Sequence, residues 1–161
     1  MQLQNGNDIH KVLSLYSKMV YRLAFARTSN HSDAEDISQE VFMTLVKKNP
    51  SFETEEKRKA WLVRVTVNKA NSLWRASWRK RVELRADIEN KRSDENDASG
   101  IREVLSALNG DERALIHLYY FEGYKTDEIA QILKRQPNTV RKQLSRARQK
   151  IKQMISKGVS V

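Results

Sequence analysis

Apolar residues in this chain recur every three or four positions and almost never in strict alternation. Between Ile9 and Arg27 they follow the spacing of one face of an amphipathic helix. Few residues interrupt such segments, since the 161 residues include only five glycines and two prolines. Because β-branched alternation is nearly absent as well, the sequence predicts an all-α fold.

The first half of the chain contains three predicted helices, near residues 9–27, 32–48 and 57–81. Ser32-Asp33-Ala34-Glu35 has the pattern of a capping box and predicts the start of the second helix, which Asn49-Pro50-Ser51 ends. The buried side of this second helix is expected to consist of Ala34, Ile37, Val41 and Leu45.

Residues 82–99 lose this periodicity and carry six acidic and three basic residues. We interpret them as a flexible linker, with a poorly packed helix as the alternative. The chain is then expected to form two small helical domains, residues 1–81 and 100–161.

The second domain has the spacing of a helix-turn-helix. A helix is expected around residues 101–108, and Asn109-Gly110-Asp111-Glu112 caps another that continues to Phe121. Gly123 marks a turn, Thr126 is expected to cap a short helix to Leu133, and Pro137 fits the first position of the last helix.

The charge is distributed in a way that points to a polyanionic partner. The formal net charge is +10, and residues 57–81 and 129–161 each hold nine Lys or Arg and no carboxylate. Two separated basic tracts predict two surfaces that meet nucleic acid.

The third predicted helix has a polar face in which residues follow at steps of four, three, four and four: Arg64, Asn68, Asn71, Arg75 and Arg79. Arg and Asn together can attract phosphates and recognise base edges. The expected apolar face comprises Trp61, Leu62, Val65 and Leu73, and the indoles of Trp61, Trp74 and Trp78 could stack on unpaired bases. The alternatives are a solvated basic face and a Trp61 that belongs to the core.

The last helix shows the same division. Its apolar seam comprises Val140, Leu144, Ala147, Ile151 and Met154, and the opposite side carries Arg141, Lys142, Ser145 and Gln149. Such a helix suits insertion into a major groove. Phosphate contacts are expected from Arg146, Arg148, Lys150 and Lys152.

The second helix differs from the others because residues 28–46 hold four acids and no Lys or Arg. An edge formed by Asp36, Gln39, Glu40 and Met43 would repel DNA, so we expect it to bind a basic protein surface. A metal-dependent nuclease could also use Asp33, Asp36 and Glu40, but no His or distant acid completes such a site. We therefore expect no catalysis, no metal and no cofactor.

The chain has no cysteine, which favours a reducing compartment, and no apolar run long enough to span a bilayer. The expected location is the cytoplasm, without membrane insertion.

Residues 33–42 read Asp-Ala-Glu-Asp-Ile-Ser-Gln-Glu-Val-Phe. This stretch matches the pattern Asp-Ala-Glu-Asp-x-x-Gln-Glu-x-Phe, and with it residues 9–155 resemble the extracytoplasmic-function group of bacterial RNA polymerase sigma factors, in the sigma-70 family. The resemblance implies that Asp36, Gln39 and Glu40 bind the clamp helices of core RNA polymerase.

Residues 61–68, with Arg75, are similar to the segment that engages the minus 10 element. The resemblance implies a pocket for a flipped base, formed by Asn68 and the loop from Ser51 to Arg58. The expected minus 10 residues are Trp61, Arg64, Asn68, Arg75 and Arg79.

Residues 124–130 and 139–148 look like the minus 35 reader, with Arg141, Lys142, Ser145 and Arg146 at the recognition positions. The implied function is promoter-specific transcription initiation with core RNA polymerase and promoter DNA as partners, and an anti-sigma factor as a regulator. The alternative is a stand-alone helix-turn-helix regulator.

Overall fold

The computed structural model describes residues 7–84 and 99–157, and the side chains of residues 7–76 and 103–157. Helices and no strands occur in these ranges, which confirms the all-α prediction. The chain forms two compact units, Met1–Glu89 and Asn90–Val161.

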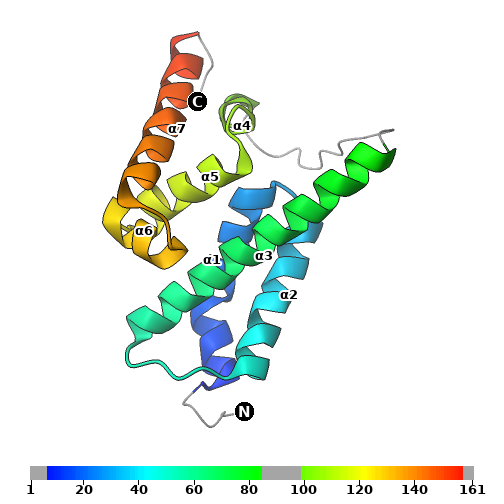
Figure 1. Cartoon of the computed structure of the whole chain (residues 1–161), viewed down its shortest axis with the longest axis vertical. Coiled ribbons are helices and arrows are strands. Elements are labelled where there is room, and N and C mark those ends of the chain that lie inside the picture. Colours follow the sequence, from blue (N-terminus) through cyan, green and yellow to red (C-terminus); the bar gives the residue numbers. More distant parts are fainter. Residues whose placement is uncertain (1–6, 85–98, 158–161) are drawn as a thin grey trace. The chain divides into compact units, whose positions relative to one another are not determined.

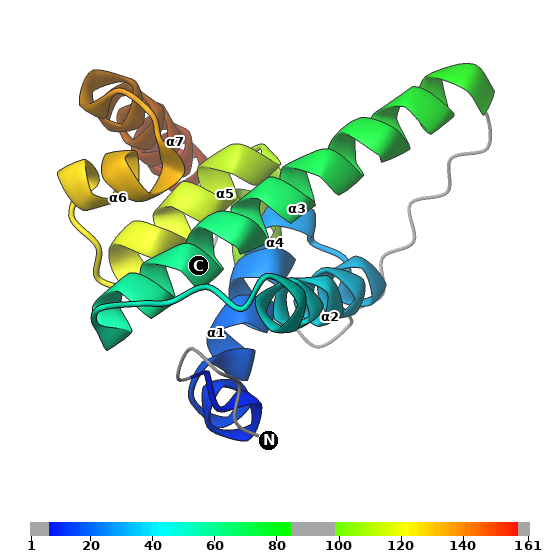
Figure 2. The ribbon, with the colours of Figure 1, turned by 60° about the horizontal axis from the view of Figure 1, so that its bottom comes forward.

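The first unit is a bundle of three helices, α1 (Ile9–Thr28), α2 (His31–Lys48) and α3 (Glu55–Leu84), each of which contacts the other two (Figure 1). Figure 2 shows α3 as the longest of them, extending well beyond its contacts with α1 and α2. The predicted inner side of α2 is confirmed, because Ala34, Ile37, Val41 and Leu45 are all buried.

The start of α2 differs from the prediction. Asn30, not Ser32, is the N-cap: its backbone is extended, and its Oδ1 accepts a hydrogen bond from the amide of Asp33 at 2.9 Å. Ser32 lies inside the first turn, because the helix begins at His31. Asn and Ser both cap helices well, so residue type alone does not distinguish Asn30 from Ser32.

The buried face of α3 also differs from the prediction. Among its described side chains, the buried residues are Arg58, Leu62, Val63, Thr66, Val67 and Ala70, whereas Trp61, Val65 and Leu73 are only half-buried. Of the four residues expected on the apolar face, Leu62 alone is fully inside. The side of α3 that packs against α1 and α2 is therefore rotated around the helix from the predicted apolar face.

The second unit contains α4 (Ser99–Ser106), α5 (Gly110–Ile116), the π-helical turn η1 (His117–Phe121), α6 (Thr126–Leu133) and α7 (Pro137–Ser156). Helix α7 contacts α4, α5 and α6. The core of this unit consists of Val104, Leu108, Ala114, Leu115, Leu118, Ile129, Ala130, Val140, Leu144 and Ala147.

The boundaries in this unit follow local chemistry. The predicted box at Asn109 is confirmed, with the Asn109 side chain accepting from the amide of Glu112 at 2.8 Å and the Glu112 carboxylate accepting from the amide of Asn109 at 3.0 Å. Gly123 turns the chain at φ 77°, a conformation that favours glycine. The cap expected from Thr126 is wrong, because Thr126 is already helical and Glu128 accepts from the amide of Lys125 at 2.7 Å. Pro137 opens α7 as predicted.

The predicted linker overlaps the end of α3, which continues to Leu84. Residues 85–98 of that segment lie outside the described residues.

Candidate nucleic-acid interface

The acidic edge of the first unit consists of Asp36, Gln39 and Glu40 on α2, and all three residues are exposed. Ile37 and Val41 point inward, so the helix packs by one side and presents the other to solvent. Glu40 Oε1 lies 3.9 Å from Nζ of Lys69 on α3, at the outer limit of an ion pair. This edge is therefore accessible to a partner surface.

A shallow hollow of about 610 Å³ between α1 and α2 borders the acidic edge through Gln39. Met43 continues the edge and is 60% exposed. An exposed thioether beside charged groups suits a protein surface better than a polyanion. The hollow is lined by Ser17, Lys18, Tyr21, Arg22, Glu35, Ser38 and Gln39.

The polar face of α3 presents Asn68 and Arg75 to solvent, with Arg64 half-buried beside them. Their spacing places these side chains along one side of the helix. Arg79 lies on the same helix, but its side chain is outside the described residues.

Trp61 belongs to this polar face, because it lies three residues before Arg64 and seven before Asn68. Its indole ring contacts the ring of Phe52, edge to face, with centroids 5.8 Å apart. Phe52 is part of the loop between α2 and α3, so an aromatic pair joins this loop to the helix. The same pair leaves Trp61 half-buried.

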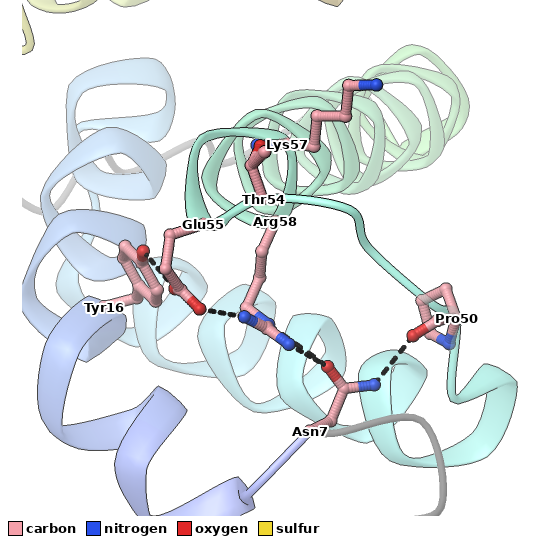
Figure 3. Close-up of polar contacts among 7 residues, drawn as sticks. All are labelled: Asn7, Tyr16, Pro50, Thr54, Glu55, Lys57 and Arg58. Atoms are coloured by element: carbon pink, nitrogen blue, oxygen red, sulfur yellow. Dashed lines mark hydrogen bonds and ion pairs between the residues drawn. The ribbon is translucent and has the colours of Figure 1, made fainter.

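The loop network consists of Asn7, Tyr16, Glu55 and Arg58, which hydrogen-bond in series next to that loop (Figure 3). The Asn7 Oδ1 accepts from Nε and Nη2 of Arg58 at 3.1 and 2.9 Å. Arg58 also pairs with Glu55, and the Tyr16 hydroxyl donates to Glu55 Oε2 at 2.8 Å. The sequence reading included Arg58 in the loop but gave no indication of its partners.

Two side chains near the loop have shifted proton affinities. Partial burial, and then the hydrogen bond to Glu55, raises the pKa of Tyr16 to about 12. The hydrogen bond from Lys57, 2.6 Å away, lowers the pKa of Glu53 below its ordinary value. Tyr16 is therefore a neutral donor and Glu53 a carboxylate at physiological pH.

Asn71 and Trp74 make internal contacts rather than extending the polar face. Asn71 Oδ1 accepts a hydrogen bond from Nε of buried Arg27 at 2.9 Å. The guanidinium of Arg27 also lies 5.7 Å from the ring centroid of Trp74. Trp74 is still 48% exposed, so one part of its ring packs internally and another faces solvent. The side chain of Trp78 lies outside the described residues.

The outer face of α7 carries the four residues expected at the recognition positions, and all four are exposed: Arg141, Lys142, Ser145 and Arg146. Arg141 Nη1 lies 3.3 Å from Oδ1 of Asp127 on α6, and its Nη2 donates to Asn138 Oδ1 at 2.6 Å. These exposed contacts give Arg141 a preferred orientation without removing it from solvent.

A second network fixes α7 against α5. Arg135 donates to both carboxylate oxygens of Asp111, at 2.8 and 3.0 Å, and to Gln143 Oε1 at 3.1 Å. Gln143 in turn donates to Asp111 at 3.1 Å. Gln143 therefore orients the helix, and no short-range pattern in the sequence indicated this.

Two of the four cations expected to bind phosphates make contacts inside the unit. Lys150 pairs with the buried Glu112 at 2.8 Å, and Arg148 donates to the Tyr120 hydroxyl at 2.8 Å while lying over the Tyr119 ring. The others, Arg146 and Lys152, are exposed. The outer cationic surface of α7 is therefore smaller than the sequence suggests.

Within the described ranges, no three or more His, Asp or Glu side chains are grouped so that they could hold a metal ion. No helix in those ranges has the length and apolar character needed to cross a membrane.

Both units match known sequence families. Residues 12–80 match Sigma-70 region 2, which covers most of the three-helix unit. Residues 99–151 match Sigma-70, region 4, which covers the helix-turn-helix unit.

The similar proteins are themselves RNA polymerase sigma factors. The chain is 32% identical over 130 residues to RNA polymerase sigma factor SigV of Bacillus subtilis, covering 79% of this chain and 78% of SigV. It is 28% identical to ECF RNA polymerase sigma factor SigM of the same species over 161 residues, covering 94% of this chain and 98% of SigM. Some relatives are longer: the chain spans 38% of the probable RNA polymerase sigma factor RfaY of Xanthomonas campestris, to which it is 28% identical over 86% of its own length.

Solved structures share the fold. The sigma factor RpoE from Bartonella quintana, solved in complex with the anti-sigma factor NepR, matches with a TM-score of 0.75 and 25% identity over 93% of this chain and 98% of RpoE. CnrH, solved with the cytosolic domain of CnrY, matches in fold with a TM-score of 0.68 at 21% identity, over 96% and 92% of the two chains. With both regions matched and a relative aligned over most of its length, the chain belongs to the extracytoplasmic-function (ECF) sigma factors of the sigma-70 family.

Proposed function

We propose that this chain is an initiation factor that binds core RNA polymerase and directs it to promoters by reading a minus 10 and a minus 35 element. The observation that carries the proposal is the pairing of a region 2 unit with a region 4 unit in one chain. Each unit presents exposed polar residues on a basic helix, and recognition of two separate promoter elements requires one such surface for each. The chain needs no chemistry of its own for this function, because it only positions the polymerase.

The first unit captures the melted minus 10 element. Asn68 and Arg75 supply exposed donors on α3, and Arg64 and Trp61 lie at the edge of the same face. An unpaired base can stack on an aromatic ring and bond through its edge to an amide. Arg79 is assigned to the same melted minus 10 DNA because it lies further along α3.

The second unit reads duplex minus 35 DNA with α7. Arg141, Lys142 and Arg146 are cations on its exposed side, and Ser145 is a hydroxyl donor between them. Val140, Leu144 and Ala147 hold the opposite side in the core, so the helix can enter a groove as a rigid element.

The acidic edge binds core polymerase. Carboxylates on a protein of net charge +10 are complementary to a basic protein surface and repel DNA. In domain terms, residues 1–81 bind polymerase and the minus 10 element, residues 100–161 bind the minus 35 element, and residues 82–99 link them.

An anti-sigma factor is the proposed regulator, acting in the cytoplasm where the polymerase works. Support comes from RpoE, which was solved in complex with the anti-sigma factor NepR. The surface most suited to such a partner is again the acidic edge with exposed Met43 and the neighbouring hollow.

The test is in vitro transcription by core polymerase with the purified chain on a library of promoters randomised at both elements. We expect new start sites that share two short sequence elements. A chain that binds specific duplex DNA alone, yet neither binds core polymerase nor redirects it, would instead be a stand-alone helix-turn-helix regulator.

A further inference from the structure

Asn7 is fully buried, which is unusual for a polar side chain located just before the first helix of a unit. Its amide nitrogen donates to the carbonyl oxygen of Pro50 at 2.8 Å and to Oδ1 of Asn49 at 3.1 Å. Its amide oxygen accepts two hydrogen bonds from Arg58. Both donors and both acceptor positions of the side chain are thereby used.

The orientation of the Asn7 amide follows from its neighbours. A guanidinium can only donate, so the amide oxygen must face Arg58, and the Pro50 carbonyl can only accept, so the amide nitrogen must face Pro50. Asp lacks the donors for Pro50, and Ala lacks both functions. The site is therefore specific for an amide of this length.

Arg58 carries the restraint from Asn7 into the loop. It is 8% exposed, pairs with Glu55 at the start of α3, and its guanidinium lies 5.2 Å from the ring centroid of Phe52. Thr54 is fixed as well, because its hydroxyl accepts from the amide of Lys57 at 3.1 Å. The loop of residues 50–54 is thus held at its beginning, middle and end.

The restraint continues to the polar face of α3. Phe52 contacts Trp61, and Trp61 lies one helical turn before Arg64 on the face that also holds Asn68. A movement of the loop would therefore shift the Trp61 ring on the face of α3 that also carries Arg64 and Asn68. Figure 3 shows Asn7 and Arg58 below this loop, pointing toward each other from separate segments of the chain.

Building on the proposed function, we propose that Asn7 acts through Arg58 and the Pro50 carbonyl as a positioning residue: it fixes the loop of residues 50–54 so that this loop and Asn68 form a pocket selective for one unpaired minus 10 base. Asn7 does not touch the DNA. A pocket whose walls are held before binding discriminates better, because the correct base does not have to order the loop.

The first test measures the loop without polymerase. Hydrogen exchange of the amides of Lys57 and Arg58, which donate to Oγ1 and the carbonyl oxygen of Thr54 at the end of the loop, is compared between wild type, Asn7→Ala and Asn30→Ala. Asn30 is a matched control, because its side chain caps α2 in the same unit and has no contact with the loop. We expect exchange about tenfold faster for Asn7→Ala alone. Equal exchange in wild type and Asn7→Ala would overturn the proposal.

The second test measures selectivity. Transcription by core polymerase is compared on promoters that differ at each minus 10 position. We expect Asn7→Ala to reduce the preference for the best base about tenfold while affinity for core polymerase changes less than twofold. Asn30→Ala should retain the wild-type preference. A wild-type preference in Asn7→Ala would contradict the positioning role.

Asn7→Asp covers the case in which the alanine variant does not fold. It keeps oxygen acceptors for Arg58 but loses the donors to Asn49 and Pro50, so we expect a folded unit with a released loop and reduced selectivity. If Asn7→Asp retains both slow loop exchange and full selectivity, the inference fails and the proposed function stands. If wild type cannot redirect core polymerase, the proposed function fails, and with it the inference about selectivity.

Discussion

The loop before α3 and the outer face of α7 are both rich in polar residues, yet they are built in opposite ways. Asn7 and Arg58 at the loop are buried, at 0% and 8% exposure, whereas the side chain of Arg141 on α7 is 54% exposed. The loop network joins segments far apart in the sequence, while the contacts of Arg141 lie at the surface. One region is fixed before any ligand arrives, and the other remains adjustable.

This difference fits the two forms of DNA that the units are proposed to read. A single unpaired base is flexible, so the protein must supply the rigid partner. A duplex groove is itself regular, and exposed side chains on a rigid helix can adjust to it. The comparison predicts that substitutions at the loop affect stability, whereas substitutions on α7 affect only binding.

The largest effect is expected from Arg58→Met. This change leaves the buried Asn7 oxygen without its two donors, so we expect the free energy of unfolding of the first unit to fall by about 2–3 kcal/mol. Tryptophan fluorescence during urea unfolding measures this unit alone, because Trp61, Trp74 and Trp78 all lie in its sequence.

Arg141→Met is the matched control, since it makes the same substitution at an exposed site. We expect a change within about 0.5 kcal/mol for the second unit, measured by circular dichroism during urea unfolding, with tryptophan fluorescence identifying the separate transition of the first unit. Equal losses at the two sites would remove the distinction between a buried and an exposed polar region.

Asn68→Ala is expected to impair promoter opening. Flipping a base out of the stack costs a few kcal/mol, which contacts to the protein must offset. Loss of the contact at Asn68 removes about 2 kcal/mol of this favourable energy, so the amount of open complex should fall about 30-fold. Permanganate reactivity of the melted region measures this effect. Assembly with core polymerase should be normal, as in the control Gln131→Ala, which removes an exposed amide from α6. Wild-type reactivity would count against a base contact at Asn68.

The double change Gln39→Ala with Glu40→Ala tests the acidic edge. We expect about tenfold weaker binding to core polymerase, equivalent to about 1.4 kcal/mol, because exposed polar contacts at a protein interface contribute modestly. Titration of labelled chain with core enzyme gives the affinity. Glu103→Ala removes an exposed carboxylate from α4 and should have no effect. Unchanged affinity of the double variant would exclude this edge as a docking surface.

Helical periodicity was enough to predict the buried side of α2 and the inner side of α7. Ile37 and Val41, like Val140 and Leu144, repeat at helical spacing, and each is buried. The prediction was wrong for α3, where hydrophobicity favoured Trp61 and Val65. Burial there depends on where α1 and α2 contact the helix, and the small residue Ala70 is inside while Trp61 is not.

The polar networks could not be predicted from the sequence. Asn7 and Arg58 are 51 residues apart, and Asp111 and Gln143 are 32 apart, so no local spacing connects them. Only the fold brings their groups within hydrogen-bond distance. The same limit explains why Lys150, which looked like a phosphate ligand, is paired with Glu112 instead.

A smaller effect is expected from Arg141→Ala, because Arg141 is exposed and already pairs with Asp127. When Arg141 leaves Asp127 to contact a base, the net gain in binding free energy is smaller than for an unpaired side chain. We therefore expect a loss of about 1 kcal/mol, or about fivefold, in discrimination between bases at one minus 35 position. Competition binding with duplex variants measures this loss. Lys152→Ala removes an exposed cation from α7 and should weaken all duplexes equally. An unaltered base preference in Arg141→Ala would contradict its assignment.

The smallest effect concerns Tyr16, at the outer end of the loop network. Burial and the hydrogen bond to Glu55 raise its pKa to about 12 in the folded chain, above the ordinary value of about 10 that holds in the unfolded chain. The stabilising contribution is therefore complete below pH 10, declines as the unfolded chain loses its proton between about pH 10 and 12, and is absent above that range. Tyr16→Phe lacks this proton, so its urea midpoint should approach that of wild type as the pH rises from 9 to 12. A constant difference between the two midpoints across that range would show that the hydroxyl does not stabilise the buried network through Glu55.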